Sequence, residues 1–129
     1  LIKKLELNKK FILLEQTNYI EDILPGLDAT VITSFSESFP NVLIESMSCG
    51  VPCFSTNVGD VSRIIYDRNW VVEIDNMKQL SNVCLKYFNS ENKEKKNVQK
   101  NLISWTHNKF NSDLTSDAYM SIYLSNDKF

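Results

Sequence analysis

The chain has 129 residues, a formal net charge of -2 and 43% hydrophobic residues, values that suit one globular domain with a modest core. The near-neutral charge leaves no electrostatic footprint for a nucleic-acid partner. No apolar run approaches the roughly 20 residues that a membrane-spanning helix needs. No signal peptide opens the chain. Its first residue is Leu1 and not Met, so we expect the chain to be a segment of a longer protein.

Short apolar runs punctuated by polar loops occupy the first 75 residues and predict the strands of a parallel sheet. The predicted strands lie at residues 11–14, 28–33, 51–55 and 71–74. The second of them is rich in β-branched residues and is expected to be a central strand. A helical turn capped by Asn18 is predicted over 20–24, and a turn with Asn69 in the left-handed region precedes the last strand.

A short amphipathic helix follows the second predicted strand. Pro40 disfavours helix before it, Asn41 is a good N-cap, and Gly50 is a usual C-terminal stop, so the helix should begin near Val42. At 100° per residue, Glu45 points away from the core, flanked by Ser46 and Ser48. The residues expected to pack on the sheet are Leu43, Ile44 and Met47.

Beyond residue 75 the pattern is helical. Helices are predicted over 77–88, 91–110 and 114–124. Strands that alternate with helices, followed by helices alone, indicate an α/β fold with a helical C-terminal tail. Three cysteines, Cys49, Cys53 and Cys84, make no disulfide framework and have no nearby ligands for zinc, so we expect buried thiols in a reducing cytoplasm and no metal.

The loop over 34–41 should lie at the carboxyl edge of the sheet, where open parallel sheets bind ligands. It leads into a helix N-terminus, where the backbone N–H groups of residues 42–44 and the helix dipole favour an anion such as a diphosphate. Glu37 and Glu45 flank this position with seven residues between them. Carboxylates repel phosphate and accept hydrogen bonds from sugar hydroxyls, so a nucleotide sugar fits both features.

This spacing by itself is a weak signal, because two glutamates often occur at such a separation and a helical glutamate is usually a solvated surface residue. Two other nucleotide-binding classes find no support, since the chain has neither a P-loop nor a G-x-G-x-x-G motif.

The stretch SESFPNVLIESMSCGVPCFST resembles the signature of the family-4 retaining glycosyltransferases, with a continuous match from Glu37 to Pro52. DATVITS before it, and TNVGD and VVEIDNMKQL after it, are similar to the neighbouring family segments. The resemblance implies a GT-B fold of two Rossmann-like domains. This chain would be part of the C-terminal, donor-binding domain, with a three-layer parallel sheet and helices on both faces. Residues 1–75 would form a truncated Rossmann-like domain, and residues 76–129 would be its C-terminal helices.

The resemblance also implies a role for each motif residue. Glu37 matches the catalytic glutamate that contacts the donor sugar, and Glu45 matches the glutamate that holds the ribose. The positions that match the sugar pocket and the diphosphate-binding backbone are Ser38, Phe39, Pro40, Asn41, Val42 and Leu43. Thr17 matches loosely the region that meets the base. The family needs no metal or cofactor, and its substrate is a nucleotide sugar, here expected to be UDP- or GDP-linked.

The full-length protein is then expected to transfer a sugar, with retention of configuration, to a glycan or lipid-linked acceptor in polysaccharide biosynthesis. It would act in the cytoplasm or peripherally at the inner face of the cytoplasmic membrane. The family's acceptor-binding N-terminal domain and its Arg/Lys pair are not recognisable in this chain, so we expect the chain alone to be inactive. Two alternatives remain: a non-catalytic nucleotide-sugar-binding module, and a related GT-B nucleotide-sugar epimerase.

Overall fold

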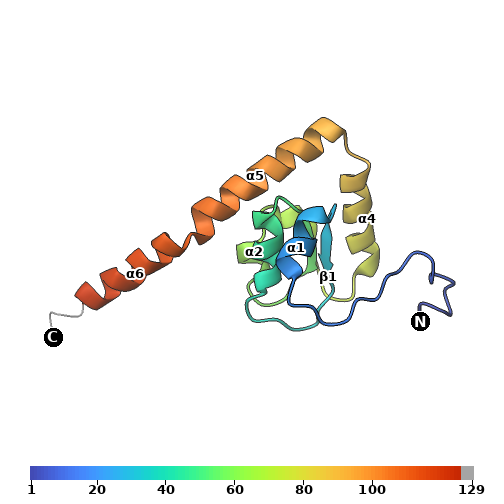
Figure 1. The fold of residues 1–129 in the computed structure, drawn as a ribbon, viewed down its shortest axis with the longest axis horizontal. Coiled ribbons are helices and arrows are strands. Elements are labelled where there is room, and N and C mark those ends of the chain that lie inside the picture. Colours follow the sequence, from blue (N-terminus) through green and yellow to red (C-terminus); the bar gives the residue numbers. More distant parts are fainter. Residues whose placement is uncertain (126–129) are drawn as a thin grey trace.

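The computed structural model describes residues 1–125 and contains a three-stranded parallel sheet in the order β1-β2-β3 (Figure 1). The strands are β1 (Thr30–Ile32), β2 (Cys53–Thr56) and β3 (Val71–Val72). Val31 pairs with Phe54 across β1 and β2, and Thr56 pairs with Val72 across β2 and β3. The predicted Rossmann-like α/β fold is therefore confirmed, although each strand is shorter than its apolar pattern.

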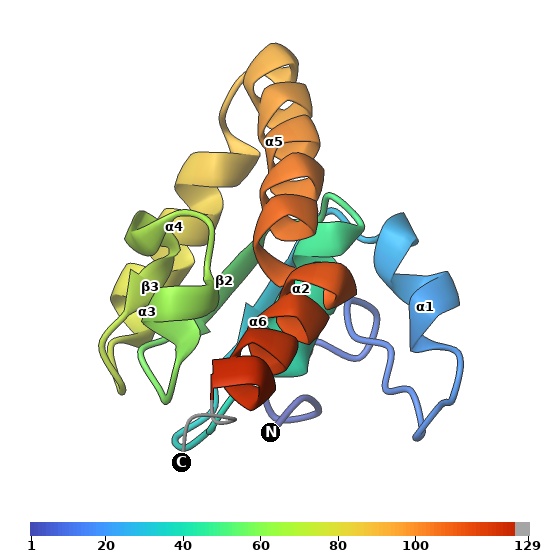
Figure 2. The same cartoon turned by 90° about the vertical axis from the view of Figure 1, so that its left-hand side faces the viewer.

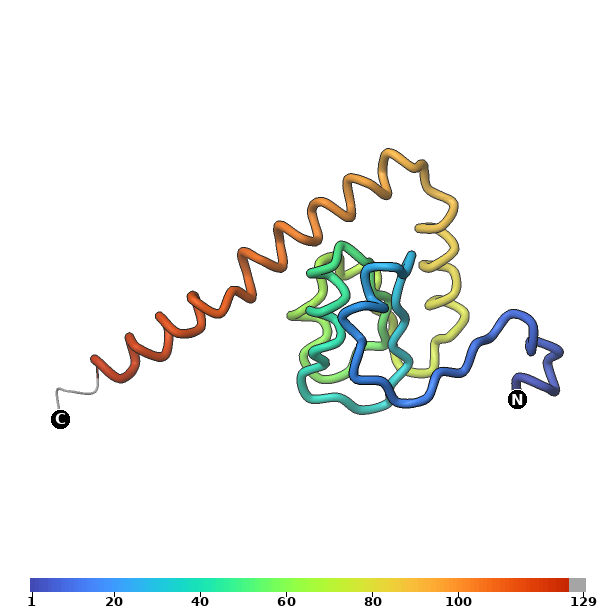
Figure 3. Tube along the Cα trace, viewed as in Figure 1, coloured from blue at the N-terminus to red at the C-terminus, as the bar shows by residue number. Residues whose placement is uncertain are grey.

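Helices flank the sheet on two sides. Their bounds are α1 Ile20–Ile23, η1 Leu24–Gly26, α2 Asn41–Ser48, α3 Val61–Ile64, η2 Arg68–Trp70, α4 Met77–Phe88, α5 Asn92–Phe110 and α6 Ser112–Ser125. α2 and α4 both contact β2 and lie on opposite sides of the sheet, and α5 packs along α2 (Figure 1). α6 extends away from the body and buries no residue (Figure 3). The last four residues of the predicted 76–129 segment lie outside the described residues.

The core forms around β2, in which every residue is buried. The Phe54 ring lies 5.5 Å from the Trp70 ring and 5.7 Å from the Tyr87 ring, measured between centroids. Leu43 of α2 and Leu102 of α5 are fully buried in the same cluster. Burial of apolar side chains from both flanking layers is the main stabilising term for such a unit.

The predicted strand at residues 11–14 is wrong. This segment has no regular secondary structure, and its apolar side chains are exposed, with Ile12 at 86% and Leu13 at 80%. The prediction of β1 as a central strand is also wrong, because β2 is central and β1 lies at an edge of the described sheet. Strand propensity reflects packing against neighbouring strands and helices, and residues 11–14 have no such neighbour here.

The predicted helix caps at Asn18 and Asn41 and the predicted left-handed conformation of Asn69 are also wrong. Tyr19, not Asn18, precedes α1, and Pro40 is the N-cap of α2, so Asn41 is already helical. Asn69 is not left-handed; its backbone N–H and its side chain both donate to the Asp67 carboxylate at 2.9 Å. At Asn69 the nearby Asp67 carboxylate supplies the partner for a local turn, so the left-handed conformation is not needed.

Gly50 ends α2 in the left-handed region with φ of +75°. An added Cβ would lie 3.2 Å from both the Gln99 carbonyl oxygen and the Ile103 side chain of α5. Gly50→Ala is therefore expected to lower the free energy of unfolding by about 1–2 kcal/mol in a urea titration. Gly26→Ala is the matched control, because its Cβ would meet nothing within 4 Å. Equal effects of the two substitutions would contradict this explanation.

Cys49, Cys53 and Cys84 are free thiols. Burial raises the pKa of Cys53 from 9.0 to about 11. Between pH 9 and pH 11 the thiol of the unfolded chain is deprotonated while that of the folded chain stays protonated. The contribution of this thiol to the free energy of unfolding is therefore fully present below pH 9 and is lost as pH rises toward 11. The loss attributable to this thiol should be about 2–3 kcal/mol. Urea unfolding at pH 8 and pH 10.5 should show a smaller alkaline loss of stability in Cys53→Ala than in the unaltered chain, and an equal loss in both would contradict this assignment.

Candidate functional site

The carboxyl ends of the three parallel strands lie at one end of the sheet and carry the loops 33–40, 57–60 and 73–76 (Figure 2). Hydrogen bonds join the strand ends and loops to one another. The Thr56 hydroxyl donates to the Ser34 carbonyl at 2.7 Å, and the Asn57 amide donates to the Glu73 carboxylate at 3.3 Å. This edge is the position at which open parallel sheets bind ligands.

Glu37 occupies the middle of the first loop, and its side chain is exposed. One carboxylate oxygen accepts a hydrogen bond of 2.8 Å from the Ser34 hydroxyl. An ionised carboxylate has about four acceptor sites, so Glu37 can take further bonds from a ligand. Phe39 is 48% exposed beside it, Ser38 is exposed, and Pro40 is buried where the loop meets α2.

Glu45 is exposed on α2, while Leu43 and Met47 on the opposite face are fully buried. The predicted orientation of the helix is therefore confirmed. Ser46, which the sequence places beside Glu45, is buried instead. Its hydroxyl lies 2.8 Å from the Thr30 hydroxyl and donates to a carbonyl of the chain segment that follows α2. Ser46 therefore anchors α2 to β1 and leaves the outer face to Glu45.

The first turn of α2 follows directly on the Glu37 loop. The Leu43 N–H donates to the Pro40 carbonyl at 3.1 Å, so it is not a free donor as the sequence suggested. The N–H groups of Asn41 and Val42 come before this bond, and the first N–H groups of a helix have no intrahelical partner. Together with the helix dipole, these two groups favour an anion at the end of α2.

Thr17 lies in the irregular segment before α1, and its hydroxyl oxygen accepts a hydrogen bond from the Tyr19 N–H at 3.1 Å. The hydrogen bonds found within residues 1–125 do not connect Thr17 with the loop of Glu37. Its role near a base therefore stays a prediction.

Residues that sequence reasoning did not assign lie in and beside the second loop. The Asp60 N–H donates to the Ser38 carbonyl at 3.0 Å, and Gly59, with φ of +50°, packs against the backbone of Glu37 and Ser38. The signal in the sequence was the glycine of TNVGD at a strand's carboxyl end, which marks a close approach of backbones.

The rest of the described structure adds three observations. A groove of about 740 Å³ is lined by residues of η2, α4 and α5, and none of its lining residues comes from the three loops. Residues 1–125 contain no group of three or more His, Cys, Asp or Glu side chains arranged to hold a metal ion. Over the same residues, no helix is both long enough and apolar enough to cross a membrane.

The fold is Rossmann-like, and at this edge of the sheet the N-terminus of α2 lies between two exposed carboxylates, those of Glu37 and Glu45. The chain belongs to the group 1 glycosyltransferase family, described as "Glycosyl transferases group 1", which it matches over residues 1–105.

Two curated relatives are similar along most of the chain and a third along a shorter part of it. The N-acetyl-alpha-D-glucosaminyl L-malate synthase of Bacillus anthracis is 26% identical over 95% of this chain and 32% of that protein. The UDP-Gal:alpha-D-GlcNAc-diphosphoundecaprenol alpha-1,3-galactosyltransferase of Escherichia coli is 24% identical over 93% of this chain and 31% of that protein. The D-inositol 3-phosphate glycosyltransferase of Paenarthrobacter aurescens is 46% identical over 37% of this chain and 12% of that protein. The chain thus spans about a third of the length of the first two relatives.

Proposed function

We propose that this chain is the donor-binding part of a family-4 retaining glycosyltransferase with a GT-B fold, and that it binds a nucleotide sugar at the carboxyl edge of its sheet. One observation carries the proposal: the Glu37 loop enters the N-terminus of α2 directly, with Glu37 exposed before it and Glu45 exposed one turn into it. A nucleotide sugar has the matching order of sugar, diphosphate and ribose.

The helix N-terminus and the two carboxylates would each bind a different part of the nucleotide sugar. The leaving diphosphate would lie at the α2 N-terminus, where the N–H groups of Asn41 and Val42 and the helix dipole offset its charge without a metal. Glu37 would accept hydrogen bonds from the donor sugar, and Glu45 from the ribose, because ionised carboxylates bind neutral hydroxyls and repel phosphate. Ser38, Phe39 and Pro40 would line the sugar pocket.

The proposal extends to the donor and the acceptor that the full-length protein would use. The name of the Escherichia coli relative specifies a UDP-linked galactose and a diphosphoundecaprenol-linked acceptor. That name supports a UDP-linked donor over a GDP-linked one and a lipid-linked or glycan acceptor for the full-length protein. We further propose that transfer retains configuration and takes place in the cytoplasm, at the inner membrane face when the acceptor is lipid-linked.

Calorimetric titration of the chain with UDP, GDP and their common sugar conjugates tests the proposal. Binding of one nucleotide series is expected, and Glu45→Ala should weaken it by about 1–3 kcal/mol, since a charge-assisted bond to the ribose is lost. Glu91→Ala, a change at the exposed N-cap of α5, is the matched control and should bind normally. The proposal fails if the full-length protein also binds none of these ligands, or if the two variants lose the same affinity.

A further inference from the structure

Two hydrogen bonds fasten the Glu37 loop to the end of β2 and to the segment that follows it, one on each side of Glu37. On the N-terminal side, the Thr56 hydroxyl donates to the Ser34 carbonyl at 2.7 Å. On the C-terminal side, the Asp60 N–H donates to the Ser38 carbonyl at 3.0 Å. Glu37 therefore lies in a short loop that is held at both ends.

The first of these bonds is connected to the Glu37 carboxylate through Ser34. Thr56 is 1% exposed in β2, so its hydroxyl is fixed by the core. It holds the backbone of Ser34, whose own hydroxyl donates to the Glu37 carboxylate at 2.8 Å. A buried side chain thus sets the position of an exposed one through a single intermediate residue, and such supporting contacts determine how precisely a functional group is placed.

Gly59 provides the second constraint through close backbone packing. An added Cβ would lie 2.5 Å from the Ser38 carbonyl oxygen and closer still to the Glu37 carbonyl oxygen. Those neighbours are backbone atoms, so the loop itself would have to move. With φ of +50°, this position also disfavours side chains in general. Only glycine allows the two loops to approach this closely.

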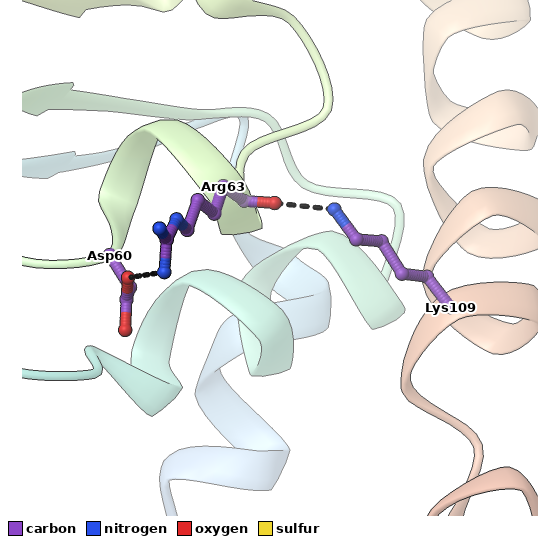
Figure 4. A network of polar contacts seen from close by, with 3 residues as sticks. All are labelled: Asp60, Arg63 and Lys109. Atoms are coloured by element: carbon purple, nitrogen blue, oxygen red, sulfur yellow. Dashed lines mark hydrogen bonds and ion pairs between the residues drawn. The ribbon is translucent and has the colours of Figure 1, made fainter.

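The segment that carries Gly59 is itself anchored. α3 begins directly after Asp60, and the Arg63 guanidinium lies 3.2 Å from the Asp60 carboxylate across its first turn (Figure 4). The Lys109 ammonium of α5 donates to the Arg63 carbonyl at the other end of the helix (Figure 4). Both contacts are exposed and each contributes little stability, but together they connect the two ends of α3 to Asp60 and to α5.

We infer that Thr56 and Gly59 are positioning residues for Glu37, and that the segment 56–60 clamps the Glu37 loop in the geometry that recognises the donor sugar. The inference rests on the proposed function for its ligand, but the clamp itself can be measured without one. Neither residue is placed in contact with the ligand. Their effect should therefore fall on recognition of the sugar and not on binding of the nucleoside diphosphate.

A ligand-free test uses limited proteolysis of the chain with chymotrypsin, which cleaves after exposed phenylalanines. The cleavable site in the Glu37 loop is Phe35, which is 73% exposed and precedes Ser36, whereas Phe39 precedes Pro40 and is resistant. Phe88 of α4, at 45%, is an internal control site. Thr56→Val should accelerate cleavage at the loop about tenfold relative to Phe88, the size expected for one lost hydrogen bond. Gly59→Ala should also accelerate it, because its added Cβ would displace the backbone of the loop. Thr56→Ser keeps the hydroxyl and should restore slow cleavage. Unchanged loop cleavage, or equal acceleration at Phe88, would overturn the clamp.

Titration of the same variants in the full-length protein provides the second readout. The preference of the unaltered protein for a nucleotide sugar over its free nucleoside diphosphate should fall about tenfold in Thr56→Val, with affinity for the diphosphate unchanged and Thr56→Ser restoring the preference. A retained preference would refute the positioning role while leaving the proposed function intact. Absence of nucleotide binding in the unaltered protein would refute the proposed function, and the proteolysis result would then decide the clamp separately.

Discussion

Replacing Glu37 by glutamine in the full-length protein is expected to reduce the proposed sugar transfer about a hundredfold. The substitution keeps the size of the side chain and removes its charge. Charge-assisted hydrogen bonds to donor hydroxyls are about twice as strong as neutral ones. A loss of about 2–3 kcal/mol from one or two of them corresponds to a rate reduction of about a hundredfold. The measurement is the steady-state rate of transfer from the donor identified by titration.

Two comparisons make this result specific. The affinity of Glu37→Gln for the free nucleoside diphosphate should match that of the unaltered protein, because the first turn of α2 and Glu45 are untouched. Glu91→Gln removes an exposed glutamate at the N-cap of α5 and should leave the transfer rate unchanged. A rate for Glu37→Gln within twofold of the unaltered enzyme would exclude the assigned role.

Phe54→Ala is expected to destabilise the domain by about 3–5 kcal/mol, the range for removing a large buried aromatic side chain. The Phe54 side chain is fully buried in the central strand and packs against Trp70 and Tyr87. Since single domains are stable by only about 5–15 kcal/mol, this change should move the urea midpoint far toward zero.

Phe35→Ala is the matched control for this substitution. It removes the same side chain from a position that is 73% exposed, so its effect on the free energy of unfolding should stay within about 0.5 kcal/mol. A loss for Phe54→Ala below 1 kcal/mol would mean that the cluster around β2 is not the main core of the domain.

Local patterns were reliable where one segment contains all the information that its structure needs. α4 lies at the predicted residues, α5 begins one residue late, and α2 has its apolar face where the 3.6-residue period places it. Gly50 ends α2 as predicted because a left-handed stop depends on the backbone of that one residue. These features follow from periodicity, capping preferences and glycine's freedom, which are local properties.

The pattern failed where burial depends on distant neighbours. Residues 11–14 are as apolar as a buried strand, yet no strand pairs with them in the described structure. Ser46 is polar, yet it is buried because Thr30, sixteen residues earlier, supplies a partner for its hydroxyl. Apolar content predicts a tendency to be buried, and only the arrangement of other elements decides whether that burial takes place.

The sequence by itself determined that this chain has a strand–loop–helix–strand unit with Glu37 and Glu45 on either side of a helix start, since the motif is continuous from residue 37 to residue 52. Only the tertiary structure decided how Glu37 is held. Thr56 and Gly59 come about twenty residues after it, and they reach its loop because parallel pairing of β1 and β2 places both carboxyl ends at one edge. Sequence spacing carries no record of that contact, because the contact is created by the register between two strands.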